Sequence, residues 1–340
     1  MKTILITGSA GYIGSHTIIE LINADFEPIG VDSYINSSEK TYDRIKQITG
    51  KTIKYYGLDL CDHPTAKKVF EENPGIAGII HFAALKSVPE SVEKPELYYR
   101  NNNDSLKNIL QLAKEFNVPN IIFSSSCSVY GNVKSLPVTE ITPLSKVESP
   151  YADTKVMGEK IVLDFVDANP GQNAVALRYF NPVGAHTSGL IGDLPINKAN
   201  NLVPIITQTA IGKIKEMQVF GEDYDTRDGT CVRDYVHVTD IADAHVLALK
   251  YLLEKRNEEN YSLFNLGTGN GVTVLEAITA FEKVTKQKLN FKITDRRAGD
   301  VAAIYSDSTK AKKVLGWKPK FNIDQMMETA WKWENNLKIS

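Results

Sequence analysis

The stretch of sequence that decides the fold is TILITGSAGYIGSH, residues 3–16. Its first five residues form a short apolar run typical of a buried strand, and a helical pattern begins at Tyr12. Between them, Gly8, Gly11 and Gly14 form a G-x-x-G-x-x-G turn. Three glycines and a histidine interrupt what would otherwise be the apolar part of a signal peptide, so we interpret the segment as strand, turn and helix.

The alternation of strand and helix continues through the first half of the chain. Apolar runs predict strands at Thr3–Thr7, Pro28–Asp32, Ile53–Asp59, Gly78–Ala84, Asn120–Ser126 and Ala174–Asn181. Helical patterns lie between them, at Tyr12–Asn23, Pro64–Glu72, Glu96–Phe116 and Tyr151–Ala168. This alternation predicts parallel strands joined by right-handed crossovers, and the nearly continuous apolar runs predict a sheet covered on both faces. The expected fold class is α/β, with a doubly wound Rossmann-type parallel sheet.

The alternation loosens after Asn181. The polar stretch Pro182–Asn201 contains Gly, Pro and Asn and is typical of a loop. Further helices are predicted at Leu202–Lys213, Val238–Leu253 and Val274–Thr285, and short strands near Gln218–Phe220 and Leu263–Leu266. We therefore expect a Rossmann domain over residues 1–180, to which a segment around 236–266 returns, and a smaller mixed α/β substrate domain over 181–340.

Composition excludes several classes of protein. The chain has 340 residues, 42% hydrophobic and 24% charged, and its net charge is −2 because 39 basic residues face 41 acidic ones. That balance argues against nucleic acid or an acidic membrane as the main partner. Apolar runs stay far below the roughly 18 residues of a membrane span. Cys61, Cys127 and Cys231 lack the spacing of disulfides or a zinc site, so we expect a soluble cytoplasmic protein without a metal.

The glycine turn predicts a dinucleotide site. The first glycine permits the tight turn, the second lets the backbone approach a pyrophosphate, and the third allows close packing of the helix, whose N-terminus attracts the anion. Asp32 ends the second predicted strand, where a carboxylate can accept both ribose hydroxyls and would repel a 2′-phosphate. The sequence therefore favours NAD over NADP. Asp59 ends the third predicted strand, where it is either an adenine contact or a simple cap.

Tyr151 and Lys155 form a Y-x-x-x-K pair on one helix face. A free tyrosine titrates near 10 and is a poor base at neutral pH. A lysine about 6 Å away stabilises the phenolate by roughly 3 kcal/mol, so the pair is suited to removing a hydroxyl proton. Ser126 follows an upstream strand and is expected at the carboxyl edge of the sheet, where such folds place their catalytic groups.

Six motifs together resemble one known family, the UDP-glucose 4-epimerases among the extended short-chain dehydrogenases. The motifs are GSAGYIGSH (8–16), HFAALKSV (81–88), FSSSCSVYG (123–131), PYADTK (150–155), LRYFNPVGAH (177–186) and DGTCVRDYVHV (228–238). The similarity runs in order through essentially the whole chain. It implies an enzyme that holds NAD and interconverts UDP-glucose and UDP-galactose by oxidising C4, turning the 4-keto sugar over and reducing it again.

The resemblance also assigns residues. It implies that Tyr151 is the general base and acid, that Lys155 is its electrostatic partner and a nicotinamide-ribose contact, and that Ser126 binds sugar O4. The implied cofactor contacts are Gly8, Gly11, Tyr12, Ile13, Gly14, Asp32, Asn36, Ser37, Asp59, Leu60, Phe82, Ala83, Lys86, Asn101, Ser126, Tyr151, Lys155 and Phe180. The implied substrate contacts are Ser126, Tyr151, Asn181, Asn201, Leu202, Phe220, Arg233, Arg297, Asp300 and Ile304. Two arginines could grip the diphosphate with their fork geometry.

Some details depart from the family or stay open. Ala152 and Thr154 stand where the family usually has Gly and Ser, and Cys127 replaces a more usual Ala. Ile304 stands where a wall residue limits room near sugar C2, which implies that N-acetylated substrates are poor. Two amphipathic helices, Glu96–Phe116 and Tyr151–Ala168, resemble those that pair in a homodimer, although packing on the sheet would explain their apolar stripes equally well.

Several other functions are alternatives to the interconversion of UDP-glucose and UDP-galactose. A 4,6-dehydratase needs an acid pair, usually Asp-Glu, where this chain has Cys127 and Ser128. A UDP-glucuronate 4-epimerase is excluded only weakly, and a UDP-N-acetylglucosamine 4-epimerase of the same family is a further alternative. A dinucleotide sensor without catalysis would be expected to have lost the tyrosine or the lysine, and both are present.

Overall fold

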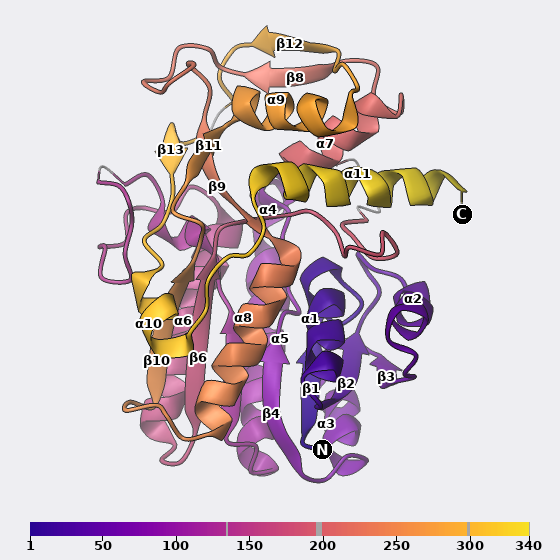
Figure 1. Cartoon of the computed structure of the whole chain (residues 1–340). Coiled ribbons are helices and arrows are strands. Elements are labelled where there is room, and N and C mark those ends of the chain that lie inside the picture. Colours follow the sequence, from indigo (N-terminus) through magenta and orange to yellow (C-terminus); the bar gives the residue numbers. More distant parts are fainter. Residues whose placement is uncertain (134, 195–198, 298–299, 340) are drawn as a thin grey trace.

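The chain forms a large parallel sheet with a smaller domain at one end (Figure 1). This computed structural model describes residues 1–133, 135–194, 199–297 and 300–339. The sheet has seven strands in the order β10-β6-β5-β4-β1-β2-β3, all pairing in parallel. The strands are β1 Thr3–Thr7, β2 Glu27–Asp32, β3 Lys54–Gly57, β4 Ile76–His81, β5 Asn120–Ser124, β6 Asn173–Tyr179 and β10 Tyr261–Leu266. The predicted doubly wound fold is confirmed.

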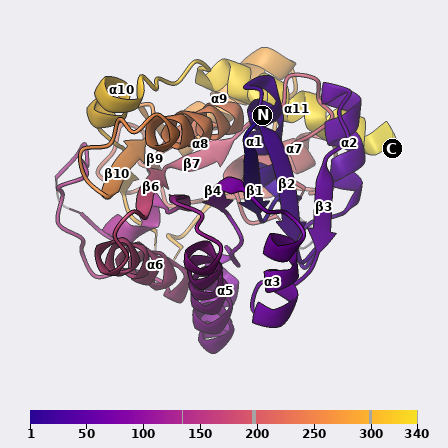
Figure 2. The same ribbon diagram turned by 90° about the horizontal axis from the view of Figure 1, so that it is seen from below.

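Helices cover both faces of this sheet (Figure 2). One face carries α1 Tyr12–Asn23 and α8 Val238–Leu253, which pack on each other. The opposite face carries α3 His63–Glu71, α5 Pro95–Glu115 and α6 Pro150–Ala168. Strand β1 explains why both layers form, because Ile4 and Ile6 join one hydrophobic core and Leu5 joins the other. The remaining helices of this part are α2 Lys40–Thr49, the short α4 Val88–Glu93 and the 3-10 turn η1 Cys127–Tyr130.

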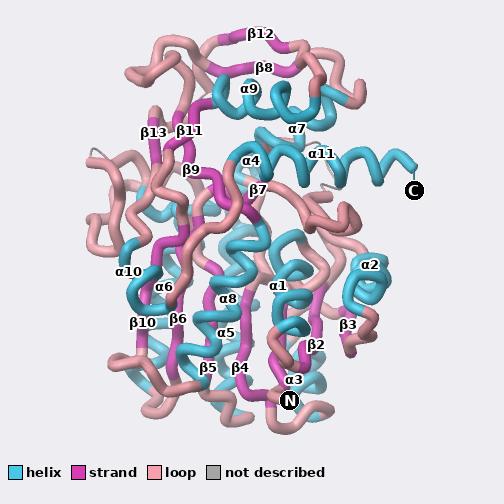
Figure 3. The backbone as a smooth tube through the Cα atoms, viewed as in Figure 1, coloured by secondary structure: helices cyan, strands magenta, loops and turns pink. Residues whose placement is uncertain are grey.

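The smaller domain lies beyond the carboxyl ends of the large sheet's strands (Figure 3). It has its own core and two small sheets, β11-β9-β13 with β7 on β9, and β12-β8. Its strands are β7 Asn181–Val183, β8 Met217–Phe220, β9 Val232–His237, β11 Gly271–Thr273, β12 Phe291–Thr294 and β13 Ala303–Ile304. Its helices are α7 Leu202–Ala210, α9 Val274–Thr285 and α11 Ile323–Ile339.

The chain crosses between the two parts more than once. After β9 it returns through α8 to β10, which forms the edge of the large sheet beside β6. A later helix, α10 Thr309–Leu315, also packs against β10 and α8, a return that the sequence did not predict. The predicted loop after Asn181 begins instead as strand β7, and residues 195–198 of that stretch lie outside the described residues. The domain boundaries themselves stay a prediction.

Candidate active site

The glycine turn lies at the carboxyl edge of the sheet, between β1 and α1. Gly8 has φ +65°, and a Cβ there would lie 2.8 Å from the backbone nitrogen of Ala83. A Cβ on Gly14 would lie 2.3 Å from the carbonyl oxygen of Gly8, so the third glycine lets the helix start close to the turn. No side chain caps the N-terminus of α1. The first backbone N–H groups of the helix are therefore available to an anion.

Asp32 links this turn to the loop after β2. Its carboxylate is buried and accepts hydrogen bonds from the backbone nitrogens of Ala10 and Tyr34, both at 2.9 Å, and from Ser37 Oγ at 2.6 Å. These donors fill three of its roughly four acceptor positions. Accepting both ribose hydroxyls, as the sequence predicts, requires the Ser37 hydroxyl to turn away.

Lys86 and Asn201, predicted for different ligands, meet at one carboxylate. Lys86 Nζ lies 3.7 Å from Asp193 Oδ1, and Asn201 Nδ2 lies 3.5 Å from Asp193 Oδ2. Lys86 also stands 5.9 Å from the centre of the Tyr12 ring, whose hydroxyl donates to the Gly184 carbonyl at 2.6 Å. The sequence did not single out Asp193, which nothing local marks as different from other loop carboxylates.

The other predicted cofactor contacts line the same edge of the sheet or the loops beside it. Phe82 packs against His245 with ring centres 4.5 Å apart. Strand β3 ends at Gly57, so Asp59 lies two residues beyond the strand rather than at its end and accepts from the backbone nitrogen of Cys61. Among the rest, Leu60 and Phe180 are buried, Asn36 is exposed, and Ile13 and Asn101 are half-buried.

Tyr151, Lys155 and Ser126 come together at this edge from α6 and the end of β5. Strand β5 ends at Ser124, and Ser126 begins the turn η1, accepting from the backbone nitrogen and hydroxyl of Ser128 at 3.2 and 3.0 Å. Lys155 Nζ donates to the Ser124 carbonyl at 2.8 Å and stands 5.2 Å from the Phe123 ring centre. Ser126 and Lys155 are 8% and 5% exposed, and Tyr151 is half-buried.

Burial sets the electrostatics of the pair. It raises the pKa of the Tyr151 phenol well above its ordinary value, Tyr179 adds to this rise, and a hydrogen bond with Ser126 opposes it. Burial also lowers the pKa of Lys155 to about 8, and Glu159 opposes that change. The field of Lys155 predicts a lowered pKa for the tyrosine, whereas desolvation of the phenol raises that pKa and is the larger effect.

The two departures in the YADTK motif are accommodated by packing. Ala152 is buried, and its backbone nitrogen donates to the N-cap hydroxyl of Ser149. The Thr154 hydroxyl donates to the Tyr151 carbonyl at 2.7 Å and accepts from Asn102 of α5 at 3.0 Å. The Thr154 hydroxyl thus links α6 to α5. Nothing in the structure explains Cys127.

The predicted diphosphate arginines share one acid. Arg297 donates to both oxygens of Asp300, at 3.1 and 2.8 Å, and its guanidinium lies 5.4 Å from the Phe220 ring centre. Arg233 Nη2 lies 3.6 Å from Asp300, while its Nη1 donates to the carbonyls of Val232 and Val301. Ile304 pairs with Arg233 across β13 and β9 and is buried. Arg233 and Arg297 thus both lie next to Asp300, which occupies the two donor groups of Arg297 that a diphosphate would need.

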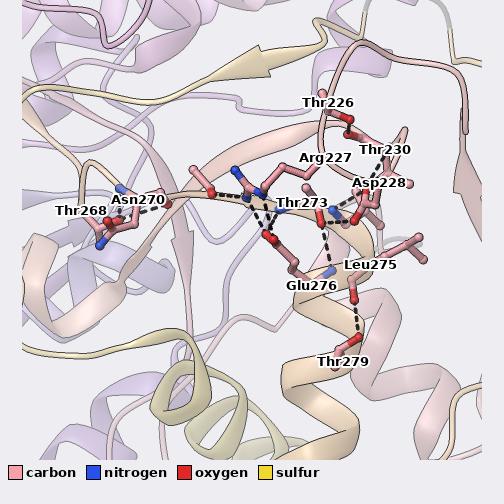
Figure 4. A network of polar contacts seen from close by, with 12 residues as sticks. Thr226, Arg227, Asp228, Thr230, Thr268, Asn270, Thr273, Leu275, Glu276 and Thr279 are labelled. Carbon is pink, nitrogen blue, oxygen red and sulfur yellow. Dashed lines mark hydrogen bonds and ion pairs between the residues drawn. The ribbon is translucent and has the colours of Figure 1, made fainter.

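A polar network holds the loop before β9, the strand that carries Arg233 (Figure 4). Arg227 donates to both oxygens of Glu276, at 2.9 and 2.6 Å, and to the Gly271 carbonyl. Glu276 and Thr273 form a capping box at the start of α9, and the Thr273 hydroxyl also donates to Asp228. The loop before β9 is thereby tied to the start of α9.

A glycine turn and a Tyr–Lys pair at one edge of a doubly wound sheet define the class of the chain, a dinucleotide-dependent short-chain dehydrogenase. Its sequence matches the family model described as GDP-mannose 4,6 dehydratase over residues 5–330. It is 47% identical to the UDP-glucose 4-epimerase of Haemophilus influenzae, over 98% of this chain and 97% of that one, and 45% identical to that of Bacillus subtilis over the same shares.

Solved structures agree with these relatives. The UDP-glucose 4-epimerase of Stenotrophomonas maltophila, with bound NAD and formylated UDP-arabinopyranose, has a TM-score of 0.96 at 41% identity, covering 100% of this chain and 99% of its own. That of Bifidobacterium longum, in complex with NAD+ and UDP, has a TM-score of 0.94 at 47% identity over 98% of each chain. The chain belongs to the matched family and, within it, to the UDP-glucose 4-epimerases.

Two features are absent from the described part of the chain. None of its helices combines the length and apolarity that crossing a membrane requires. No group of three or more His, Cys, Asp or Glu side chains in these ranges is arranged to hold a metal ion.

Proposed function

We propose that this chain interconverts UDP-glucose and UDP-galactose, using a tightly held NAD. The observation that carries the proposal is the convergence of Tyr151, Ser126 and Lys155 beside the glycine turn, in a chain 47% identical over nearly its full length to a UDP-glucose 4-epimerase. The NAD-bound and UDP-bound relatives support both ligands.

The residues of the turn fit NAD. The positive φ of Gly8 and the close approach of Ala83 leave no room for a side chain, so backbone alone faces the site. The uncapped start of α1 suits a pyrophosphate, and Asp32 suits a ribose without a 2′-phosphate. When bound, NAD supplies the acceptor and later the donor of the C4 hydride.

The protein's own residues handle the proton and the orientation. Tyr151 takes the proton of the sugar O4 hydroxyl and gives a proton back to O4 after the sugar has turned over, and Ser126 holds O4 by a hydrogen bond. The buried charge of Lys155 favours the phenolate that burial disfavours. Arg233, Arg297 and Phe220 hold the nucleotide, and a diphosphate displaces Asp300 from Arg297. A firm grip on UDP leaves the 4-keto sugar free to turn over.

The 4,6-dehydratase reading takes its support from the description of the family model. The curated relatives favour epimerisation, and Cys127 and Ser128 stand where the dehydratase acid pair would be. Ile304 favours unsubstituted sugars over N-acetylated ones.

The experiment supplies each UDP-sugar in turn to the purified protein without added NAD. UDP-galactose should yield UDP-glucose, with a much lower kcat/KM for the N-acetylated analogue; no product from UDP-galactose would overturn the proposal.

Assembly and location complete the proposal. Large apolar side chains are exposed over the helices α4, α5 and α6: Val92 at 61%, Leu97 at 44%, Met157 at 39% and Leu163 at 37%. Because α5 and α6 lie side by side on one face (Figure 2), two copies can bury these side chains in a four-helix interface. We place the homodimer in the cytoplasm, where Cys61, Cys127 and Cys231 would stay reduced.

A further inference from the structure

A buried ion pair lies directly behind the Tyr151–Lys155 pair. Glu159 of α6 and Arg178 of β6 are 8% and 4% exposed. Arg178 Nε donates to Glu159 Oε1 at 2.8 Å and Nη2 to Oε2 at 2.6 Å, a bidentate contact. Such pairs contribute little stability compared with apolar residues of the same size, because desolvation offsets the attraction. A net gain in stability therefore does not explain this ion pair, and its position next to Lys155 suggests another role.

The carboxylate joins three elements at the carboxyl edge of the sheet. Ser125 Oγ, just after β5, donates to Glu159 Oε1 at 2.5 Å, and the backbone nitrogen of Ser125 donates to Leu177 of β6 at 3.0 Å. The neighbouring residue, Ser124, accepts from Lys155 Nζ. Lys155 and Glu159 are one turn apart on α6, so their side chains share a face about 6 Å apart.

We propose that Glu159 is a positioning residue for Lys155. The buried carboxylate of Glu159, held by Arg178 and Ser125, keeps the Lys155 ammonium charged and holds α6 against the ends of the strands. The inference rests on the proposed function, because it concerns the lysine that favours the Tyr151 phenolate. The Glu159 carboxylate itself contacts neither the substrate nor the cofactor in this proposal.

The surroundings of Lys155 explain why it needs this partner. Burial lowers the pKa of Lys155 to about 8, and Glu159 opposes the change. Among the described residues, the titratable groups next to Lys155 and Glu159 carry no further negative charge at neutral pH, because burial keeps the imidazole, the phenols and the thiol uncharged and Arg178 is a cation. They are His81 of β4, Tyr151 of α6, Arg178 and Tyr179 of β6, Tyr98 of α5, Cys127 and Tyr130 of η1, and Tyr261 of β10.

The test compares pH profiles of kcat for UDP-galactose conversion by NAD-loaded wild type and Glu159→Gln between pH 6 and 10. Without the carboxylate, the pKa of Lys155 should be lower, so the fall of kcat at alkaline pH (the alkaline limb of the profile) should begin about one pH unit lower. At the alkaline end this corresponds to an up to tenfold loss of kcat. Asp164→Asn is the matched control, because it removes one negative charge from the solvent-facing side of the same helix. Its limb should not move.

A limb that stays in place in Glu159→Gln, whatever the fall in kcat, would show a merely structural role, and a wild-type profile flat to pH 10 would also overturn the inference. If the stranded Arg178 prevents folding, Glu159→Gln is combined with Arg178→Gln, a neutral amide pair of similar size, and the limb should still move lower. Failure of the proposed function is separate, since the wild type would then make no UDP-glucose at any pH.

Discussion

At the scale of single residues, the site depends on keeping charge in a dry environment. Lys155 is 5% exposed, and its ammonium has the Ser124 carbonyl as its hydrogen-bond acceptor. Desolvation raises the pKa of the Tyr151 phenol, and the hydrogen bond with Ser126 and a nearby positive charge both act to lower it. The phenol is therefore a working base only when the whole site, lysine and NAD included, is assembled.

Removing the Tyr151 hydroxyl tests that role. Tyr151→Phe deletes the group that carries the O4 proton while keeping the ring, so kcat should fall by about 10²- to 10⁴-fold. Turnover is measured by a coupled assay and UDP binding by calorimetry. UDP binding should be retained, because Arg233 and Phe220 are unchanged. Near-normal turnover would rule out the assignment.

At the scale of elements, the β1–α1 turn shows what a sequence can predict. The bounds of β1, α1, α8 and α9 were predicted correctly because apolar periodicity and flanking turn residues mark them locally. Helix α2 was missed because it buries only Tyr42 and Ile45, which leaves almost no apolar stripe. Strand β9 was missed because it buries Asp234, whose five hydrogen-bond donors come from residues 268–269 and 306.

The same limit applies to the site. The glycine turn, Asp32 and the Tyr151–Lys155 pair could be predicted from local patterns, and the other predicted contacts come from the family resemblance. The ion pair of Glu159 with Arg178 and the shared acid Asp193 could not, because each is made by residues from different elements. The energetic effect of burial on Tyr151 also requires the three-dimensional structure.

Gly8→Ala tests the turn itself. The new Cβ would lie 2.8 Å from Ala83 nitrogen in a left-handed conformation that costs an alanine about 1–2 kcal/mol, so the purified variant should carry little NAD. Gly50→Ala is the matched control, since it has a similar φ of +71° with nothing within 4 Å of its Cβ. It should lose similar stability but keep the cofactor, measured by absorbance and enzymatic assay of released NAD. Full NAD content in Gly8→Ala would contradict the assigned site.

At the scale of the whole molecule, both parts of the chain depend on buried neutral histidines. Burial lowers the pKa of His16, His81 and His237 to about 3 and that of His245 to about 4. These rings cannot take up protons without leaving the core. The link between pH and stability follows directly.

Stability should fall as the solution is acidified. In the unfolded chain histidine titrates near 6.5, so between pH 6.5 and about 4 the unfolded state binds more protons than the folded one. The free energy of unfolding should therefore fall with pH in that window, by up to about 1.4 kcal/mol per pH unit for each histidine. Urea midpoints at pH 7.5, 6 and 5 measure this, and His245→Gln should have a shallower dependence. Constant midpoints over this range would refute the argument.

The dimer is tested by charging its proposed interface. Met157→Glu with Leu163→Glu would place two carboxylates on α6, and burying them costs several kcal/mol, so light scattering after size exclusion should give the mass of one chain. Ile293→Glu alters a comparably exposed residue, 41% accessible on β12 of the smaller domain, and should leave the dimer intact. An unchanged mass in the double variant would place the interface elsewhere.

In the proposed reaction, the hydrogen removed from C4 stays in the site and returns to the sugar. The most direct measurement uses UDP-galactose carrying deuterium at C4, incubated with the purified protein in ordinary water and followed by mass spectrometry of the UDP-glucose formed. We expect the product to keep its deuterium through many turnovers. Loss of the label to solvent would rule out a hydride that returns to the same sugar.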